Sequence, residues 1–458
     1  MTNFFGTDGV RGVAGSYLNA ELASSLGRYS TYVISQKNTK KIRIVIGKDT
    51  RISSDMLEAA FVSGALSQGA EVLTLGVIPT PAVAYITRKL GADAGVVISA
   101  SHNPFQYNGI KFFNSCGEKL CDELEEEIEE YLLGKKTIDS SLVGADIGRL
   151  KNYSDGTEDY LNHAVSAANC DLSGMKIAVD CSNGANSFVA PEAFKKLGAE
   201  VFLKSASPDG ININENCGSV HIESLSEFVR NCGADVGIAF DGDADRVLAV
   251  DENGDILSGD VLIGLIAIDY KKRGILSANT VVGTVMSNMG LILTLKEHGI
   301  DFIATNVGDR YVYEKMSEIK GVIGGEESGH IISTLYNTTG DGLVCALEFL
   351  KLLKNSGKKT SELRKCVTIL PQIMVNAKTN GVPSKEILSD QALSLCISDV
   401  ESKYAGNGRV LIRPSGTEPL IRIMIEGTDK AEMQADAEKI KDYIDAVISR
   451  KGDKPCAE

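Results

Sequence analysis

Three copies of one strand–helix pattern constrain the fold of this chain of 458 residues more than any other feature. In each copy, an apolar strand is followed by a helix, a strand that begins with glycine, another helix and a further strand that runs into a polar loop. The first strands of the copies cover residues 42–46, 176–180 and 280–284. Strands that alternate with helices form sheets covered on both faces. We therefore expect an α/β fold in which three similar domains with mixed sheets surround a central cleft.

Each copy ends in an unusual polar loop directly after a strand. The three loops cover residues 99–104, 241–246 and 324–330. In sheets of this kind, ligands bind at the carboxyl ends of the strands. Three domains that present these loops to one shared cleft are the economical interpretation, and three unrelated surface turns are the alternative.

The C-terminal part of the chain follows a different pattern. A strand, a helix, two more strands and a closing helix are expected near residues 373–375, 385–403, 408–413, 420–426 and 430–449. This order predicts a smaller C-terminal α+β domain, in which the loop 413–419 joins two strands. A polar, weakly periodic stretch at 135–158 predicts a domain boundary. The expected domains are 1–150, 151–255, 256–367 and 368–458.

The composition argues against several classes of protein. The net charge is −14, from 61 acidic and 47 basic residues, and such a field repels nucleic acid and anionic lipid. An anionic small substrate would therefore need positive charge concentrated at its site.

There is no run of about 18 apolar residues that could span a membrane, and the first residues lack the features of a signal peptide. The ten cysteines form no CxxC pair, so we expect free thiols in a cytoplasmic protein.

Asp241, Asp243 and Asp245 place three carboxylates on alternate residues after the last strand of the second copy. In an extended segment this spacing puts them on one face, where together they could hold a hard divalent cation such as Mg²⁺. A solvated acidic turn is the alternative. An EF-hand is excluded, because Arg246 occupies the sixth position of the loop, which must be glycine, and because a strand precedes the loop.

Ser101 follows the last strand of the first copy, in the sequence Ser-His-Asn-Pro. By itself such a sequence is typical of a simple turn. The metal loop, however, occupies the same position in the next copy, and a hydroxyl beside a divalent cation could carry a phosphoryl group. Lys111 follows shortly afterwards. It could neutralise charge or transfer a proton, or it could be an ordinary exposed lysine.

Two further loops carry polar side chains suited to a phosphorylated sugar. In the third copy, Glu326 and Ser328 offer an acceptor and a hydroxyl for adjacent sugar hydroxyls, and His330 is either a proton shuttle or a core histidine. In the C-terminal domain, backbone N–H groups, hydroxyls and a guanidinium in one turn predict an anion site. This site comprises Arg413, Ser415, Gly416 and Thr417, with Arg422 on the following strand.

Together these loops resemble those of the α-D-phosphohexomutases. They occur in the order found in that family, and the resemblance extends over nearly the whole chain. The segments similar to the phosphoserine, magnesium, sugar-recognition and phosphate-binding loops are 101–104, 241–246, 325–330 and 413–419.

Four more segments resemble the bacterial branch of this family that acts on glucosamine phosphates. They are residues 5–12, 47–51, 217–219 and 308–312. Two positions depart from that branch, because Glu327 stands where glutamine is usual and Val220 replaces the threonine before His221. Both positions lie near recognised motifs and bear on the sugar preference.

The resemblance implies an intramolecular phosphotransferase of the isomerase class. It would interconvert glucosamine 6-phosphate and glucosamine 1-phosphate, on the way to UDP-N-acetylglucosamine, through a bisphosphate intermediate. Ser101 would carry the phosphate and contribute to the Mg²⁺ site with the three aspartates. A hexose or hexosamine 1,6-bisphosphate would act as the activator.

Other site residues take their roles from the same resemblance. Arg11 and Arg246 would stabilise the transferring group, and Lys111, His102 or His330 would handle the proton. The C-terminal anion site would bind the phosphate that does not react. The expected partner is a phosphosugar substrate, and a homodimer is the assembly considered. A phosphomannomutase or phosphoglucomutase is the nearest alternative, and a non-catalytic phosphosugar-binding regulator is the alternative from another class.

Overall fold

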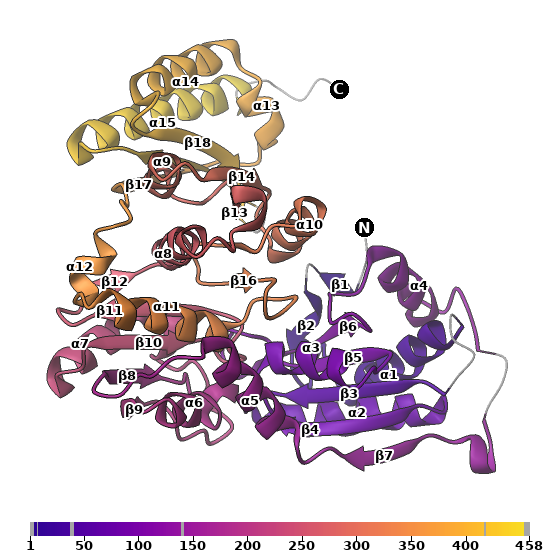
Figure 1. The fold of residues 1–458 in the computed structure, drawn as a ribbon. Coiled ribbons are helices and arrows are strands. Elements are labelled where there is room, and N and C mark those ends of the chain that lie inside the picture. Colours follow the sequence, from indigo (N-terminus) through magenta and orange to yellow (C-terminus); the bar gives the residue numbers. More distant parts are fainter. Residues whose placement is uncertain (1–3, 7, 37–40, 139–141, 416–417, 453–458) are drawn as a thin grey trace, which may run out of the picture. The chain divides into compact units, whose positions relative to one another are not determined.

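The structure is a computed structural model that describes residues 4–6, 8–36, 41–138, 142–415 and 418–452 (Figure 1). The chain divides into two compact units. The larger unit consists of residues 1–286 and 298–366, and the smaller unit of residues 287–297 and 367–458. Among the described residues, no helix combines the length and the apolar character needed to cross a lipid bilayer.

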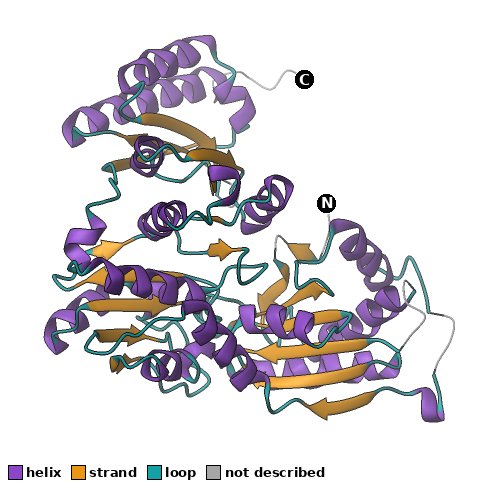
Figure 2. Cartoon of the chain, in the orientation of Figure 1, coloured by secondary structure: helices purple, strands orange, loops and turns teal. Residues whose placement is uncertain are grey.

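The first sheet of the larger unit is mixed and covered by helices on both faces (Figure 2). Its strands are β1 (Phe5–Gly6), β2 (Gly9–Val13), β3 (Arg43–Lys48), β4 (Glu71–Val77), β5 (Ala94–Ile98), β6 (Tyr107–Asn114) and β7 (Arg149–Asn152). Its helices are α1 (Ala20–Ser35), α2 (Ile52–Ser67), α3 (Thr80–Lys89) and α4 (Asp122–Leu132). The strand order is β1-β2-β6-β5-β3-β4-β7, with β6 antiparallel to β5. Apolar side chains of α1, α2 and α4 pack on one face. On the other face, Val83 of α3 fills the space beside Gly47 and Gly95.

The second sheet has the order β12-β11-β10-β8-β9. Its strands are β8 (Lys176–Asp180), β9 (Glu200–Lys204), β10 (Val236–Phe240), β11 (Val247–Asp251) and β12 (Ile256–Leu257). Its helices are α5 (Gly156–Ala168), α6 (Ala190–Lys196) and α7 (Glu223–Cys232). β8, β9 and β10 are parallel, and β11 returns antiparallel to β10. Since Phe240 pairs with Val247, the segment 241–246 forms the loop of this hairpin.

The third sheet has the order β14-β13-β15-β16. Its strands are β13 (Thr280–Thr284), β14 (Asp301–Thr305), β15 (Ile323–Gly325) and β16 (Ile331–Ser333), and the helices of this part are α8 (Gly259–Lys272), α10 (Asp309–Ile319), α11 (Gly342–Ser356) and α12 (Thr360–Arg364). β15 is parallel to β13, and β16 is antiparallel to β15. In all three sheets, therefore, a polar loop follows a parallel strand and leads into an antiparallel one. The prediction of three similar α/β domains with mixed sheets is confirmed.

The smaller unit contains an antiparallel sheet in the order β17-β19-β18. Its strands are β17 (Gln372–Lys378), β18 (Arg409–Pro414) and β19 (Leu420–Glu426), and its helices are α9 (Met289–Glu297), α13 (Ser384–Leu388), α14 (Gln391–Tyr404) and α15 (Lys430–Gly452). Ile421, Ile423 and Ile425 alternate along β19 and pack on apolar side chains of α14 and α15. The small C-terminal α+β domain is therefore confirmed.

Two local features differ from the sequence-based prediction. The stretch 135–158 contains β7, and all four of its side chains are exposed. Since β7 pairs with β4 through backbone groups, no alternation of apolar residues reveals it in the sequence. The helix expected over 385–403 is two helices, because α13 ends at Leu388 and the Asp390 side chain caps a new helix, α14.

Asp341 connects the second and third parts of the larger unit. Its buried carboxylate caps α11 by accepting a hydrogen bond from Val344 N at 3.0 Å. The same carboxylate accepts hydrogen bonds from Tyr160 Oη of α5 at 2.7 Å and from Asn337 Nδ2 at 2.9 Å. Removal of this group would leave several buried donors without an acceptor, and such donors are costly to desolvate.

We predict that Asp341→Ala lowers the free energy of local opening at α11 by about 2–4 kcal/mol, because it removes a helix cap and leaves buried donors unpaired. Hydrogen exchange followed by mass spectrometry measures this opening helix by helix. The matched control is Asp390→Ala, which removes the partly exposed cap of α14 and should cost about 1 kcal/mol at that helix alone. Equal effects of the two substitutions would contradict the prediction.

Candidate active site

Ser101 lies directly after β5 in a strained backbone conformation. Its φ of 52° lies in the left-handed region, which residues other than glycine seldom adopt. The side chain is buried, and its Oγ donates a hydrogen bond to Asp241 Oδ2 at 2.6 Å. The hydroxyl of the first copy and the acidic loop of the second copy therefore meet, as the shared-cleft interpretation predicts.

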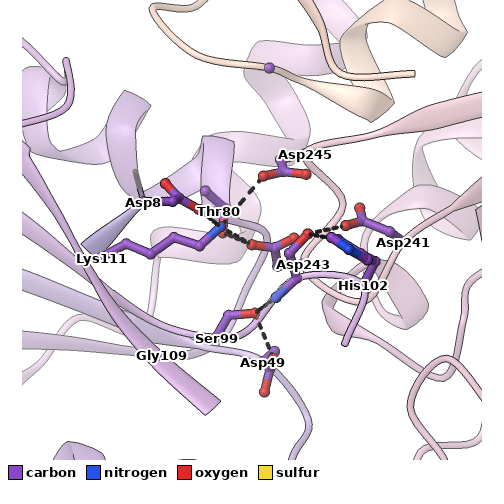
Figure 3. Close-up of polar contacts among 12 residues, drawn as sticks. Asp8, Asp49, Thr80, Ser99, His102, Gly109, Lys111, Asp241, Asp243 and Asp245 are labelled. Carbon is purple, nitrogen blue, oxygen red and sulfur yellow. Dashed lines mark hydrogen bonds and ion pairs between the residues drawn. The ribbon is translucent and has the colours of Figure 1, made fainter. Parts of the chain in front are cut away.

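Asp241, Asp243 and Asp245 form a compact buried cluster (Figure 3). Each offers one carboxylate oxygen, and these three oxygens lie within 4.8 Å of one another. The Oδ1 atom of Asp243 is buried and accepts no hydrogen bond from the described residues. Three converging hard oxygen donors fit a divalent cation such as Mg²⁺.

The charges of this cluster are strongly perturbed. Burial, together with the neighbouring carboxylates of Asp245 and Asp243, raises the pKa of Asp241 well above its usual value. Burial also acts to raise the pKa of Asp245, but Lys111 and His330 hold it well below the usual value. Such opposite shifts are expected where like charges share a buried site.

The acidic loop is held in shape by contacts within its hairpin and by α3. Arg246 N donates to Asp241 Oδ1 at 3.2 Å, and Ala244 adopts a φ of 60°. At the start of α3, Thr80 donates to Asp243 twice, from its N–H to the backbone oxygen at 2.9 Å and from its hydroxyl to Oδ2 at 2.6 Å. No local sequence pattern around Thr80 marks it as part of a site.

Lys111 lies on β6, opposite Val97 of β5. Its buried Nζ lies 2.9 Å from Asp243 Oδ2, 2.9 Å from Asp8 Oδ2 and 3.5 Å from Asp245 Oδ2. Burial would lower the pKa of Lys111, but the three carboxylates raise it well above the usual value. Of the roles considered for Lys111, the neutralisation of negative charge is the one that this geometry favours.

Six side chains of alternating charge form a closed ring of ion pairs that passes through Asp245 of the acidic cluster. Lys119 Nζ lies 2.7 Å from Asp8 Oδ1 and 2.6 Å from Asp309 Oδ2. Asp309 Oδ2 lies 3.3 Å from His330 Nε2, whose Nδ1 is 3.6 Å from Asp245 Oδ1. Lys111 closes the circuit between Asp245 and Asp8. We call this set, which is Asp8, Lys111, Lys119, Asp245, Asp309 and His330, the charge ring. The charge ring contains residues from each of the three domains that are built on the first, second and third sheets.

His330 is a cation of the charge ring. Burial lowers its pKa, but Asp309 and Asp245 raise it to about 9. Gly340 N–H also points at Nε2 from 3.2 Å, a contact that suits only a neutral ring. Two carboxylates oppose this single donor and favour the protonated ring. Asp8 and Asp309 lie in segments that resemble the glucosamine branch, whereas no sequence signal marked Lys119.

His102 lies beside Ser101 and is affected by the charges of two arginines. His102 Nδ1 is 3.4 Å from Ser101 Oγ. Burial and the charges of Arg246 and Arg11 lower the pKa of His102 to about 4, so its imidazole is neutral at pH 7. Arg11 Nη2 lies 3.3 Å from Asp8 Oδ2 and Arg246 Nε lies 3.9 Å from Asp245 Oδ1. The two guanidinium groups suit an anionic substrate, and each of them also lies near an aspartate.

The loop of the third copy lies beside the acidic loop. Val247 N, just after Arg246, donates to Gly329 O at 2.9 Å. Glu326 Oε1 accepts a hydrogen bond from Gly308 N at 3.0 Å. Burial acts to lower the pKa of Arg246, but the charges of Asp245, Asp241 and Glu326 raise it. Ser328 is exposed. The structure therefore brings the predicted residues of the first three loops together.

The fourth predicted loop belongs to the smaller unit and is described by itself. Arg413 of β18 and Arg422 of β19 are direct partners in the antiparallel register, so their side chains share one face of the sheet. Ser415 N donates to Leu420 O at 2.9 Å. Two guanidinium groups on one face suit an anion. Gly416 and Thr417 lie outside the described residues.

Models of one family match the chain in four consecutive segments. The alpha/beta/alpha domains I, II and III of phosphoglucomutase/phosphomannomutase match residues 2–138, 158–254 and 258–369, and its C-terminal domain matches residues 359–442. Together these segments span most of the chain.

Proteins named phosphoglucosamine mutase are similar to this chain over nearly its full length. The protein from Acetivibrio thermocellus is 52% identical over 430 residues, which cover 94% of this chain and 96% of the relative. The protein from Thermoanaerobacter sp. (strain X514) is 51% identical over 449 residues, which cover 98% of this chain and 100% of the relative.

Solved structures share the fold at lower identity. A phosphoglucomutase/phosphomannomutase family protein from Burkholderia thailandensis has a TM-score of 0.81 at 23% identity, and the match covers 100% of this chain and 99% of the other. The N-acetylphosphoglucosamine mutase of Aspergillus fumigatus, in complex with GlcNAc-6P and magnesium, has a TM-score of 0.65 at 18% identity over 98% and 96% of the two chains. From its four matched segments and its close relatives, and in agreement with its four loops, this chain belongs to the phosphoglucomutase/phosphomannomutase family, the α-D-phosphohexomutases.

Proposed function

We propose that this chain is a phosphoglucosamine mutase, which interconverts glucosamine 6-phosphate and glucosamine 1-phosphate. The observation that carries the proposal is the contact of Ser101 Oγ with Asp241 of the buried acidic cluster, at 2.6 Å. Glucosamine phosphate is supported as the substrate by the sequence identity of 52% and 51% to two proteins named phosphoglucosamine mutase. A non-catalytic regulator is disfavoured, because binding alone requires neither a buried hydroxyl nor a metal cluster beside it.

The enzyme that starts the reaction carries a phosphate on Ser101. Asp241, Asp243 and Asp245 would hold Mg²⁺, which supplies charge neutralisation at a phosphoryl oxygen when it is bound. The free hydroxyl of the sugar phosphate attacks the phosphorus, so that a new O–P bond forms while the bond from phosphorus to Ser101 Oγ breaks. Arg11 and Arg246 would stabilise the charge of the transferring group.

The attacking hydroxyl must lose a proton during this step. Three groups of the site were considered for it, namely His102, Lys111 and His330. The pKa of His102 is lowered to about 4, so His102 is the one of the three that is neutral at pH 7. Burial acts to lower the pKa of Lys111 and of His330, but the carboxylates around them raise it, to about 9 for His330. Both groups therefore favour the cationic form, and one of them can supply the proton that Ser101 Oγ takes up as its bond to phosphorus breaks.

The first half-reaction produces a hexosamine 1,6-bisphosphate. This intermediate must reorient in the site before its other phosphate is transferred to Ser101. Arg413, Ser415 and Arg422, with Gly416 and Thr417, would bind the phosphate that is not reacting, and Glu326 and Ser328 would bind sugar hydroxyls in both orientations. The same bisphosphate, supplied from outside, would phosphorylate Ser101 and so activate the enzyme. The product would serve the synthesis of UDP-N-acetylglucosamine. A cytoplasmic location and a homodimeric assembly stay predictions from the sequence.

Ser101→Ala should reduce mutase turnover by more than about 10³-fold while the fold persists, because the covalent phosphoryl carrier is lost. The coupled assay with glucosamine 6-phosphate measures the turnover. Intact-mass analysis after incubation with glucose 1,6-bisphosphate should show one added phosphate on the unsubstituted chain and none on the variant. Ser67→Ala, on α2 and outside the site, is the matched control and should behave as the unsubstituted chain. A normal rate for Ser101→Ala would refute the scheme.

Chelation of divalent cations should abolish turnover, and added Mg²⁺ should restore it. Asp243→Asn should raise the Mg²⁺ concentration needed for half-maximal activity by at least about tenfold, because it removes a charged oxygen ligand. Asp255→Asn, at the far end of the β11 hairpin, removes an exposed carboxylate paired with Arg364 and should leave the Mg²⁺ dependence unchanged. Full activity in the presence of excess chelator would show that the acidic cluster does not hold a required metal.

Glucosamine 6-phosphate should have a kcat/KM at least about tenfold higher than that of glucose 6-phosphate or mannose 6-phosphate, since a site built to hydrogen-bond one group rejects analogues that lack it. Side-by-side assays of the three phosphates under the same activating conditions measure the preference. A higher kcat/KM for mannose 6-phosphate or glucose 6-phosphate would replace the proposed function by the corresponding mutase.

A further inference from the structure

The backbone carbonyls of the Ser101 loop are held by two side chains that have no place in the reaction described above. The first is Arg51, whose side chain is fully buried. Its Nη2 donates to Ser101 O at 2.8 Å and to Asn103 O at 2.9 Å, and its Nη1 donates to Pro104 O at 2.6 Å. Arg51 thus spreads its guanidinium over three carbonyls of one short loop, an arrangement that no other side chain type can reproduce.

The second side chain is Asn214, in the segment between β9 and α7 of the second sheet's domain. Its buried Nδ2 donates to Ser101 O at 2.9 Å and to Asn103 O at 3.1 Å. These are the same two carbonyls that accept from Arg51. A carbonyl oxygen can accept two hydrogen bonds, one for each lone pair. Each of these two carbonyls therefore has its full number of donors, one from Arg51 in the Ser101 domain and one from Asn214 in the domain that supplies the acidic cluster.

The opposite side of the loop is fixed as well. Ser101 N donates to Ser99 Oγ at 2.9 Å, and Ser99 Oγ donates to Asp49 Oδ2 at 2.6 Å (Figure 3). Asp49 Oδ2 also accepts from Arg51 Nε at 2.8 Å. One buried ion pair, Asp49 with Arg51, therefore anchors the N–H and the C=O of the same residue, Ser101.

The space around these carbonyls is closed by Gly242 of the acidic loop. A Cβ atom at Gly242 would lie 2.7 Å from Ser101 O and 2.8 Å from Asn214 Nδ2, closer than a Cβ atom comes to other heavy atoms in proteins. The Ser101 carbonyl, the Asn214 amide and the acidic loop are therefore packed directly against one another.

Ser101 needs such support because its backbone is strained. A non-glycine residue in the left-handed region costs of order 1 kcal/mol or more, and it persists only where the surroundings over-determine it. This conformation turns Oγ toward Asp241. Among the described residues, Arg51 and Asn214 provide the hydrogen bonds to the carbonyl oxygen of Ser101.

We propose that Arg51 and Asn214 are positioning residues, which hold the Ser101 loop by its carbonyls and so direct Ser101 Oγ toward the acidic cluster. The proposal rests on the proposed function of Ser101 as the phosphoryl carrier. Neither side chain touches the sugar or the phosphorus. Their effect passes through the loop, and Asn214 makes the direction of Ser101 depend on the domain that carries the acidic cluster.

Substitution at these positions should lower kcat and leave KM almost unchanged. Asn214→Ala and Arg51→Lys should each reduce kcat by about tenfold, because small displacements of a reacting group carry such penalties. KM for glucosamine 6-phosphate should change by less than about threefold, since sugar contacts are kept. Arg51→Met should be worse than Arg51→Lys, because a lysine still neutralises Asp49. The double variant of Arg51→Lys and Asn214→Ala should lose less than the product of the single losses, since both act on the same two carbonyls.

Thr50→Val provides the matched control. Thr50 is adjacent to Arg51, and its hydroxyl donates to Asn183 O at 2.6 Å, between the same two domains but without a hydrogen bond to the Ser101 loop. This variant should keep the kcat of the unsubstituted chain. An equal loss of kcat in Thr50→Val would show that any weakened contact between these domains has the same effect, and would overturn the specific role of the two carbonyl donors.

Hydrogen exchange of the peptide spanning residues 99–107 separates this proposal from the proposed function. Exchange should accelerate in Asn214→Ala and Arg51→Lys but not in Thr50→Val, and this readout needs no turnover. Unchanged exchange, or accelerated exchange with unchanged kcat, would overturn the positioning role. If the unsubstituted chain has no mutase activity, the proposed function fails, and the exchange rates alone then decide whether the two side chains anchor the loop. Should Arg51→Lys not fold, Asn214→Ala carries the test.

Discussion

The burial of three carboxylates in one hairpin loop is the constraint on which the rest of the larger unit depends. Charges removed from water destabilise a fold unless they are paired with opposite charges or a metal. Asp241, Asp243 and Asp245 come from the second sheet's domain, whereas the cations nearest to them, Lys111 and His330, come from the first and third. The acidic loop therefore reaches electrostatic balance only when all three domains are folded against one another.

The charge ring extends this balance beyond the acidic cluster. Asp8 and Asp309 each lie between two cations of the ring, and Lys119 bridges them. Alternation matters, because every carboxylate then has two cationic neighbours and each cation two anionic ones. Such a network holds Lys111 and His330 as charged groups beside the acidic cluster, which Ser101 contacts through Asp241. Phosphoryl transfer requires mainly positioning and charge stabilisation rather than covalent chemistry by the protein, and these are what the ring offers.

The sequence predicted the residues proposed to carry out the chemistry better than the residues that hold them in place. Ser101 and the three aspartates could be found because a serine and alternating aspartates after equivalent strands form a local pattern. Thr80, Lys119 and Asn214 could not, because each acts on a partner far away along the chain and stands in an ordinary local sequence. The same limit applies to secondary structure, where β7 pairs by backbone alone and its exposed side chains show no periodicity.

Burial and neighbouring charges distinguish the two histidines that the sequence offered for proton transfer. His102 and His330 are the same residue type in two polar loops, yet arginines and burial lower the pKa of the first to about 4 while two carboxylates raise that of the second to about 9. No sequence pattern distinguishes these cases.

The sequence by itself determined the three repeated domains, the fourth smaller one, the order of the loops and the residue types that they present, because these follow from periodicity and local motif. The tertiary structure alone decided which loops meet, which groups are charged and what holds Ser101 in its strained conformation, because electrostatics and hydrogen bonding depend on neighbours that are distant in the chain.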